Sequence, residues 1–217
     1  HQGLIANPNC STAQLVVALK PLHDVFPIKR LVVSTYQAVS GAGNKAVEEL
    51  YMQTEQMLSG QQAHPQVLPG PIAFNLIPYI GSFLENGYTD EEMKMSDEVR
   101  KIMEADIPTC ATCIRVPVAN GHSESVNIEF AQPVSPERAR DLLSVAPGIV
   151  VRDDPKHRHF PTPQEISGTD PVYVGRIRRD VSNPNALNIW VVADNLRKGA
   201  ALNAIQIAES LIEQGLL

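Results

Sequence analysis

The sequence predicts an α+β fold in which a mixed, mostly antiparallel sheet carries helices on one face. Segments with helical periodicity alternate irregularly with short segments rich in β-branched residues. An Asn120-Gly121 pair lies between two such strand-like segments, which is typical of a hairpin and therefore of antiparallel pairing. The chain contains no internal repeat and no low-complexity tract.

The first 60 residues are expected to form two strands and two helices. Asn9 stands where a helix N-cap is expected, and apolar residues follow it at helical spacing until Pro21 ends the helix. Asn44 is the expected cap of a second helix, which Gly60 stops. In order, these elements are a strand at 4–6, a helix at 10–20, a strand at 28–37 and a helix at 44–58.

The next segment, 61–86, is irregular because it is rich in proline and glycine. Thr89 and Glu92 then form a capping-box pattern, which predicts a helix that continues to about Met103. The expected elements after it are hairpin strands at 112–118 and 123–130, a helix at 136–145, strands at 148–152, 172–180 and 187–192, and a closing helix at 195–214 capped by Asp194 or Asn195.

The composition is that of a globular protein that acts on small molecules. The 217 residues are 43% hydrophobic and 19% charged, which allows a substantial core. A net charge of −6 and a pI near 5.5 argue against a nucleic-acid partner, because phosphate neutralisation needs clustered Lys and Arg. Three cysteines suit a reducing compartment, and the apolar runs are far shorter than the roughly 20 residues of a membrane helix. We therefore expect a cytoplasmic protein without a membrane partner.

Cys10 is the strongest candidate for chemistry in the sequence. It falls in the first turn of a predicted helix, between Asn9 and Ser11, where backbone N–H groups lack intrahelical partners. The positive end of the helix dipole favours a thiolate there, and a thiolate attacks carbonyl groups. The alternative is a small buried cysteine without reactivity.

His122 and Arg115 form a second candidate group. In a two-residue hairpin Ala119 pairs with His122 and Arg115 pairs with Val126, so the base and the cation point to the same face. Arginine grips a carboxylate in two places, and histidine titrates near neutral pH. The alternative is a solvated histidine at a hairpin tip and an arginine in a surface salt bridge.

Other local patterns are weaker. Residues 41–46 match a dinucleotide fingerprint, but no second strand with an acidic end follows, so a tight turn is expected. Cys110 and Cys113 form a lone C-x-x-C without the second pair of a structural zinc site. Residues 157–159 contain two histidines in a polar loop, and we expect no metal there. Glu91 and Lys94 are helical neighbours, and most such pairs are solvated.

Five segments together resemble the aspartate-semialdehyde dehydrogenase family along nearly the whole chain. They are residues 6–12, 34–43, 91–94, 115–118 followed by 121–123, and 194–201. The related acetylglutamyl-phosphate reductases carry a glycine before the cysteine and an aromatic residue after it, whereas Asn9 and Ser11 flank Cys10 here.

The resemblance implies a reaction and a set of roles. NADPH-dependent reductive dephosphorylation of aspartyl phosphate would give aspartate semialdehyde and phosphate, reversibly, on the route to lysine (through diaminopimelate), methionine and threonine. Cys10 would form the thioester, His122 would be the acid/base on the tetrahedral adduct, and Gln37 would position the intermediate. Arg115 would bind the α-carboxylate. Glu91 would contact the substrate amino group, and Lys94 and Asn9 would help to bind phosphate. The residues near the nicotinamide of NADP would be Ser40, Gly41, Gly43 and Asn195.

The resemblance also implies an organisation. The fold would be that of the C-terminal domain of glyceraldehyde-3-phosphate dehydrogenase-like enzymes, and two copies would form a homodimer. Residues 1–9 would be a remnant of a dinucleotide-binding domain, 10–194 the catalytic and dimerisation domain, and 195–217 a helix that packs on the NADP-binding domain. We expect that the chain has been cut upstream and that by itself it binds NADP poorly and has little activity.

Two other functions stay open at this stage. A non-catalytic dimerisation or binding module could keep the scaffold, although it has no reason to retain Cys10, Gln37, Arg115 and His122 together. Acyl transfer by a Cys–His pair would need no nicotinamide, so NADPH-dependent product formation would separate it from the dehydrogenase.

Overall fold

The structure is a computed structural model that describes residues 3–216; His1, Gln2 and Leu217, at the ends of the predicted segments 1–9 and 195–217, lie outside the described residues. In chain order the elements are α1 (Cys10–His23), β1 (Ile28–Gln37), the 3-10 helix η1 (Val39–Ala42), α2 (Asn44–Leu58), α3 (Asp90–Met103), β2 (Thr109–Arg115), β3 (His122–Phe130), α4 (Pro136–Ser144), β4 (Ile149–Val151), α5 (Pro163–Ile166), β5 (Val172–Arg179), β6 (Ala186–Ala193), the π-helix η2 (Arg197–Ala201) and α6 (Leu202–Glu213).

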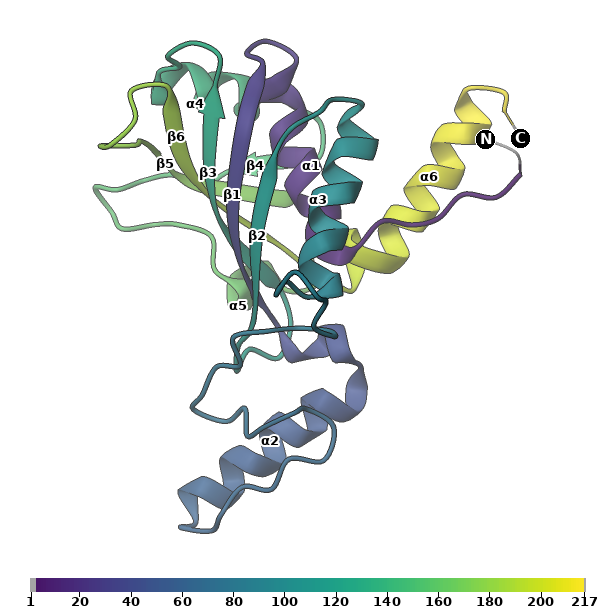
Figure 1. The fold of residues 1–217 in the computed structure, drawn as a ribbon, viewed down its shortest axis with the longest axis vertical. Helices are drawn as coiled ribbons and strands as arrows, with labels where there is room; N and C mark the ends of the chain where they lie inside the picture. Colours follow the sequence, from purple (N-terminus) through teal and green to yellow (C-terminus); the bar gives the residue numbers. More distant parts are fainter. Residues whose placement is uncertain (1–2, 217) are drawn as a thin grey trace.

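The strands form one mixed sheet with the order β2-β1-β3-β6-β5-β4 (Figure 1). The central pairings, β1 with β3, β3 with β6 and β6 with β5, are antiparallel, whereas β2 and β4 join the edges in parallel. The prediction of a mixed, mostly antiparallel sheet is therefore confirmed.

The predicted hairpin is wrong, because β2 and β3 are not neighbours. β1 lies between them, and its Gln37 is opposite Arg115 of β2 while its Tyr36 is opposite Ser123 of β3. The segment between β2 and β3 instead hydrogen-bonds to the end of β1 and to η1, with Val39 N donating to Val118 O. A buried, apolar β1 has two edges to pair, so inserting it satisfies more backbone groups than a two-stranded ribbon does.

Other elements also differ from the expectations: the strand predicted at 112–118 is β2 at Thr109–Arg115, and the closing helix predicted at 195–214 is η2 followed by α6. Residues 4–6 form no strand. α1 continues through Pro21 to His23, because Pro21 lies in the last turn and Asp24 N still closes that turn on Lys20 O. Gly43 rather than Asn44 occupies the N-cap position of α2. The predicted N-cap of α1 at Asn9 and the capping box of α3 between Thr89 and Glu92 are confirmed.

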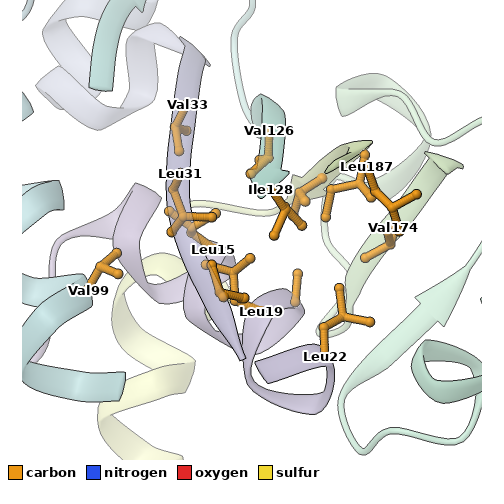
Figure 2. Close-up of a cluster of buried hydrophobic side chains, with 14 of the residues drawn as sticks. Leu15, Leu19, Leu22, Leu31, Val33, Val99, Val126, Ile128, Val174 and Leu187 are labelled. Atoms are coloured by element: carbon orange, nitrogen blue, oxygen red, sulfur yellow. The ribbon is translucent and has the colours of Figure 1, made fainter. Parts of the chain in front are cut away.

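The main core lies between the sheet and helices α1, α3 and α4. Leu15, Leu19 and Leu22 of α1 point at side chains from β1, β3, β5 and β6, including Leu31 and Ile128 (Figure 2). Leucines at this spacing share one helix face, so α1 is fixed over the middle of the sheet. Helices on one face were predicted; among the helices within residues 3–216, the short α5 alone packs on the opposite face, in a cluster made of Ile166, Tyr173, Val192 and Trp190.

A second cluster joins α2 to the irregular segment that follows it. Leu50 of α2 packs with Leu68 and Ile72, and Gln53 Oε1 accepts hydrogen bonds from Ile72 N at 2.8 Å and Ala73 N at 3.2 Å. α2 projects away from the sheet at one end of the molecule (Figure 1). The irregular segment is therefore ordered by α2 rather than by the main core.

At the other side of the molecule α6 stands apart from the sheet, alongside the chain before α1 (Figure 1). None of its residues is buried, and Ile205 and Ile212 are exposed. The length and apolar character needed to cross a membrane are not found together in any helix within residues 3–216.

Candidate active site

Cys10 lies at the start of α1, where Asn9 fixes the first turn. Asn9 Oδ1 accepts hydrogen bonds from Ser11 N at 2.9 Å and Thr12 N at 3.2 Å, so two of the free N–H groups of the helix are satisfied. Asn9 is itself held from α3, since its N–H donates to Glu98 Oε2 at 2.8 Å. The position of the cysteine is therefore set by contacts on both sides of its backbone.

The thiol of Cys10 is neutral at pH 7, which corrects the expectation of a thiolate at the helix start. Burial, and then the charge of Glu91, raise its pKa to about 11. The Ser11 N–H and the charge of Arg115 act in the opposite direction but are weaker. Desolvation disfavours the thiolate more than one helix terminus stabilises it.

Gly199 closes the space beside Cys10. A Cβ added at Gly199 would lie 2.9 Å from Cys10 Cβ and 3.2 Å from its Cα, closer than side chains pack. The π-helix η2 presents this glycine, and such insertions recur at functional sites. The sequence shows Gly199 only as a motif residue, so its contact with Cys10 could not be inferred.

His122 is the first residue of β3 and is fully buried. Its Nδ1 accepts the Ala38 N–H at 3.1 Å, so the proton of the neutral ring is on Nε2. Burial, and then the charge of Arg115, lower its pKa to about 3. Nε2 has no hydrogen-bond partner within residues 3–216, so a neutral imidazole presents an unused N–H.

Arg115 and His122 meet at Gly41, although the predicted hairpin register is wrong. A Cβ added at Gly41 would lie 3.0 Å from Arg115 Nη1 and 3.2 Å from His122 Nε2. Arg115 is anchored because Nη1 donates to Ala38 O at 2.7 Å. The adjacent ends of β1, β2 and β3 therefore bring a cation and an imidazole to one point. The sequence predicted that the two side chains lie together, but through a hairpin that does not form.

A carboxylate links the remaining predicted substrate residues. Glu91 Oε1 accepts from Asn9 Nδ2 at 2.8 Å and from Gln37 Nε2 at 3.3 Å. Lys94 Nζ lies 3.8 Å from Glu91 Oε2, and its side chain is half exposed. Glu91, Gln37 and Asn9 thus form one hydrogen-bonded group beside Cys10, and Lys94 reaches it from solvent.

The predicted cofactor residues lie in and beside η1, where Gly43 N donates to Ser40 O at 2.9 Å. Ser40 and Asn195 hydrogen-bond to each other, Asn195 Nδ2 to Ser40 Oγ at 3.0 Å, and Gly121 N donates to Asn195 Oδ1 at 2.8 Å next to His122. Gly41 borders the same region. Gly43 is exposed at the N-cap of α2, where an added Cβ would meet nothing within 4 Å.

Two acids with clear roles were not identified as site residues. Glu98 holds the backbone of Asn9 and lies two turns after Glu91 on α3, so helical spacing is the signal that could have found it. Asp194 Oδ1 accepts from Leu196 N and Arg197 N, and its Oδ2 accepts from Gly168 N at 2.7 Å. Asp194 therefore orders the turn that leads into η2, whereas the N-cap position of η2 is Leu196 and neither Asp194 nor Asn195 as the sequence predicted.

The weaker patterns form no site in the described part of the chain. No group of three or more His, Cys, Asp or Glu within residues 3–216 is arranged to hold a metal ion. Cys110 and Cys113 are both free thiols. His157 pairs with Asp154 in an exposed loop.

The chain is similar to proteins of known family. Residues 19–198 match the family described as "Semialdehyde dehydrogenase, dimerisation domain". Aspartate-semialdehyde dehydrogenase from Aquifex aeolicus is 54% identical over the whole chain, and that from Synechocystis sp. is 51% identical. The chain spans 64% of the length of both relatives.

Solved structures show the same likeness. Aspartate semialdehyde dehydrogenase II complexed with ASA from Vibrio cholerae superposes with a TM-score of 0.93 at 48% identity, over 96% of this chain and 62% of that one. The enzyme with NADP from Candida albicans gives a TM-score of 0.72 at 29% identity, over 98% of this chain and 58% of that one.

Proposed function

The chain belongs to the semialdehyde dehydrogenase family and contains its dimerisation domain, and from this premise we propose that it is the catalytic, subunit-pairing portion of an NADP-dependent aspartate-semialdehyde dehydrogenase. The reaction would be the reversible reductive dephosphorylation of aspartyl phosphate to aspartate semialdehyde. It belongs to the aspartate route to lysine, methionine and threonine. The observation that carries the proposal is the meeting of Arg115 and His122 at Gly41, with Cys10 within electrostatic reach of Arg115.

Cys10 is the nucleophile in this proposal. Its sulfur attacks the acyl carbon of aspartyl phosphate, the C–S bond forms and the bond to phosphate breaks, which gives a thioester. Since the resting thiol is neutral, its proton leaves on attack, and the departing phosphate dianion can accept it. One hard displacement is thereby split into two easier steps.

His122 is the acid and base that acts on the oxygen of the tetrahedral adduct in this proposal. With Nδ1 occupied by the Ala38 N–H, the ring offers a proton at Nε2 to the developing oxyanion and takes it back when the adduct collapses. The lowered pKa of His122 means that the ring is a neutral donor across the physiological pH range. A ring held neutral by burial is suited to this role rather than to removing the Cys10 proton.

The remaining polar residues suit an amino-acid substrate. The planar guanidinium of Arg115 can grip the α-carboxylate in two places, and Glu91 offers a carboxylate to the α-amino group. Lys94 is a half-exposed cation beside them and suits a phosphate group. Asn9 contacts the same carboxylate, because its Nδ2 donates to Glu91 Oε1. Gln37 holds Glu91 and so positions the substrate next to Cys10.

The residues beside His122 fit the nicotinamide end of a bound NADP. Ser40, Gly41 and Asn195 form a small polar edge there, and Gly41 leaves room where a side chain would not fit. A bound NADPH would supply the hydride that reduces the thioester. Gly43 continues this edge, since its N–H donates to Ser40 O at 2.9 Å. Residues 41–46 lack the second strand of a phosphate-binding unit, so we expect weak NADPH binding by these 217 residues and little or no turnover.

The sheet face opposite the main core suits pairing with a second copy. Tyr36 and Trp190 lie on it with ring centroids 5.6 Å apart, and Val32 and Ser125 beside them are also partly exposed. A half-covered face that exposes two aromatic rings, on a chain that matches a dimerisation domain, supports a homodimer through this face.

Thioester formation tests the proposal without any cofactor. The chain is mixed with aspartyl phosphate, and intact-mass analysis with peptide mapping locates the added aspartyl group. We expect one acylation at Cys10, none in Cys10→Ser, and retention in Cys110→Ser as the matched control. Acylation spread equally over the three cysteines, or absent from Cys10, would refute the proposed function.

A further inference from the structure

A buried pair of polar side chains lies directly beneath the Cys10–His122 pair. Gln14 is one helical turn after Cys10 on α1, and Glu124 is two residues after His122 on the same face of β3. Both side chains have no solvent exposure. The proposed reaction gives neither of them a part.

The hydrogen bonds around this pair are incomplete unless one more proton is present. Gln14 Nε2 donates to the backbone oxygen of His122 at 3.4 Å. The Gln14 amide also lies beside the Glu124 carboxyl, to which it can hydrogen-bond. Gln14 Oε1 and both carboxyl oxygens of Glu124 receive no hydrogen bond within residues 3–216. With the amide nitrogen directed at His122, the amide oxygen is the atom left to meet Glu124.

An ionised Glu124 would leave both of its oxygens without a hydrogen bond within residues 3–216, and the side chain of Gln14, which lowers the pKa of Glu124, has a smaller effect than burial. A buried carboxylate without a partner is among the costliest groups in a protein, and burial accordingly raises the pKa of Glu124 well above its usual value. The titratable groups near it supply no positive charge: His122 is neutral, and the thiol of Cys113 on β2 has its pKa raised to about 12. Its partners in register, Thr35 on β1 and Val191 on β6, carry no charge. A protonated carboxyl converts one acceptor into a donor and satisfies Gln14 Oε1.

Resting on the proposed function, we propose that protonated Glu124 is a positioning residue for the Cys10–His122 pair. Its O–H donates to Gln14 Oε1, while Gln14 Nε2 holds the oxygen of His122. The helix that carries the nucleophile and the strand that carries the imidazole are thereby joined one layer below the reacting groups. Loss of this link lets α1 and β3 move relative to each other, which changes the separation of the sulfur and the ring.

Three variants separate positioning from simple packing. Glu124→Gln keeps the shape and supplies an N–H donor to Gln14, so the link persists. Glu124→Leu keeps most of the volume and removes the donor. Gln14→Leu removes the link from the other side and is the second variant if Glu124→Leu does not fold.

The protonation state has its own readouts. Infrared spectroscopy of the wild-type chain should show the C=O stretch of a buried carboxylic acid, and Glu124→Gln should lose it. In the unfolded chain Glu124 ionises above its usual pKa of 4.5, while the folded chain keeps the proton. The wild type therefore loses stability relative to Glu124→Gln as the pH rises above 4.5. A missing band, or a stability difference that does not change with pH, would show an ionised Glu124 and overturn the proposal.

Positioning is read from His122 and Cys10. We expect the ring ¹⁵N resonances of His122 to shift in Glu124→Leu and Gln14→Leu but not in Glu124→Gln. Acylation of Cys10 by aspartyl phosphate should be about tenfold slower in the two leucine variants and within about twofold of wild type in Glu124→Gln.

The outcomes distinguish the two proposals. Unchanged His122 resonances and unchanged acylation in both leucine variants would overturn the positioning role and leave the proposed function intact. If wild-type Cys10 does not acylate at all, the proposed function fails, while shifted His122 resonances would still support the link between Glu124 and the strand.

Discussion

At the residue scale, the balance between burial and charge decides the behaviour of Cys10. A helix N-terminus is expected to favour a thiolate, but the two N–H groups that it supplies, those of Ser11 and Cys10, act on a sulfur that is largely removed from water. Two charged neighbours with opposite effects, Glu91 and Arg115, then set the remaining balance. The reactivity of the Cys10 thiol is therefore adjustable by single substitutions.

Removing the charge of Glu91 and removing the charge of Arg115 should shift the pKa of Cys10 in opposite directions. Glu91→Gln should lower it from about 11, because the carboxylate disfavours the thiolate, and Arg115→Met should raise it. The measurement is the rate of Cys10 alkylation against pH, followed by mass mapping. Glu209→Gln on the exposed face of α6 is the matched control and should leave the curve unchanged. Shifts of the same sign in the two variants would contradict this electrostatic account.

The buried neutral His122 makes the fold sensitive to acid. Its pKa is about 3 in the folded chain and 6.5 in the unfolded one, so the unfolded chain binds the extra proton first. Stability therefore falls as the pH drops below 6.5 towards 3, by up to about 5 kcal/mol from this group. Denaturant titrations of wild type and His122→Asn across this range measure it. The asparagine can accept the Ala38 N–H without titrating, so equal pH dependence in both chains would disprove the assignment.

At the element scale, two helix starts surround the nucleophile. Asn9 caps α1 through Oδ1 and reaches Glu91 through Nδ2, so one side chain joins the helix start to the substrate group. The π-helix η2 closes the other side with Gly199. Asn9 therefore acts on Cys10 through the backbone of α1, whereas Gly199 packs against the Cβ and Cα of Cys10.

Asn9 allows its two contacts to be separated. Asn9→Ala removes the cap and should cost about 1 kcal/mol of stability, and Asn9→Ser should restore most of it, because serine caps as well as asparagine. Neither variant keeps the contact with Glu91. We therefore expect Cys10 acylation to stay slow in Asn9→Ser although its unfolding midpoint recovers; recovery of both together would show that capping alone matters.

Gly199 should tolerate no side chain. In Gly199→Ala the new Cβ would press on Cys10 Cβ and Cα, so either η2 or the start of α1 must shift. We expect acylation of Cys10 to fall by at least about tenfold. Ala201→Ser, at an exposed position of the same π-helix, is the control. A Gly199→Ala chain with wild-type acylation would show that the contact has no influence on the nucleophile.

At the scale of the whole molecule, one sheet serves two purposes. Its covered face packs on α1 and α3 and holds the ends of β1, β2 and β3 at the site, while its open face carries Tyr36 and Trp190. Pairing through the open face would leave the site at the strand ends free. The proposed dimer and the proposed chemistry are thus compatible in one chain.

A charge on the open face should break the proposed dimer. Ser125 lies on β3 opposite Trp190, so Ser125→Arg would place a cation in the apolar contact. Sedimentation velocity should show a monomer, with acylation of Cys10 retained if each site is complete within one chain. Ser210→Arg on exposed α6 is the control. A dimer that persists in Ser125→Arg would locate the pairing surface elsewhere.

The local signals were sufficient for most elements and for part of the site. The Asn9 cap, the Thr89 capping box and the apolar periodicity depend on residues a few positions apart, so they can be recognised in the sequence. The failures involve distant partners: β1 inserts between β2 and β3 because its buried edges pair on both sides, and the Asn120-Gly121 turn cannot show this. Gly199 and Glu124 act on residues far away in the chain, and no local pattern marks them.

By itself the sequence determined the α+β class, the mixed sheet, the helix starts at Asn9 and Thr89, and the family that the chain resembles, and it proposed the candidate side chains. Only the tertiary structure decided the strand order, the neutral thiol of Cys10, the Nε2–H form of His122 and the buried pair of Glu124 and Gln14. The physical reason is that periodicity and capping are set by neighbours in the chain, whereas burial, and with it every pKa at this site, is set by groups that only folding brings together.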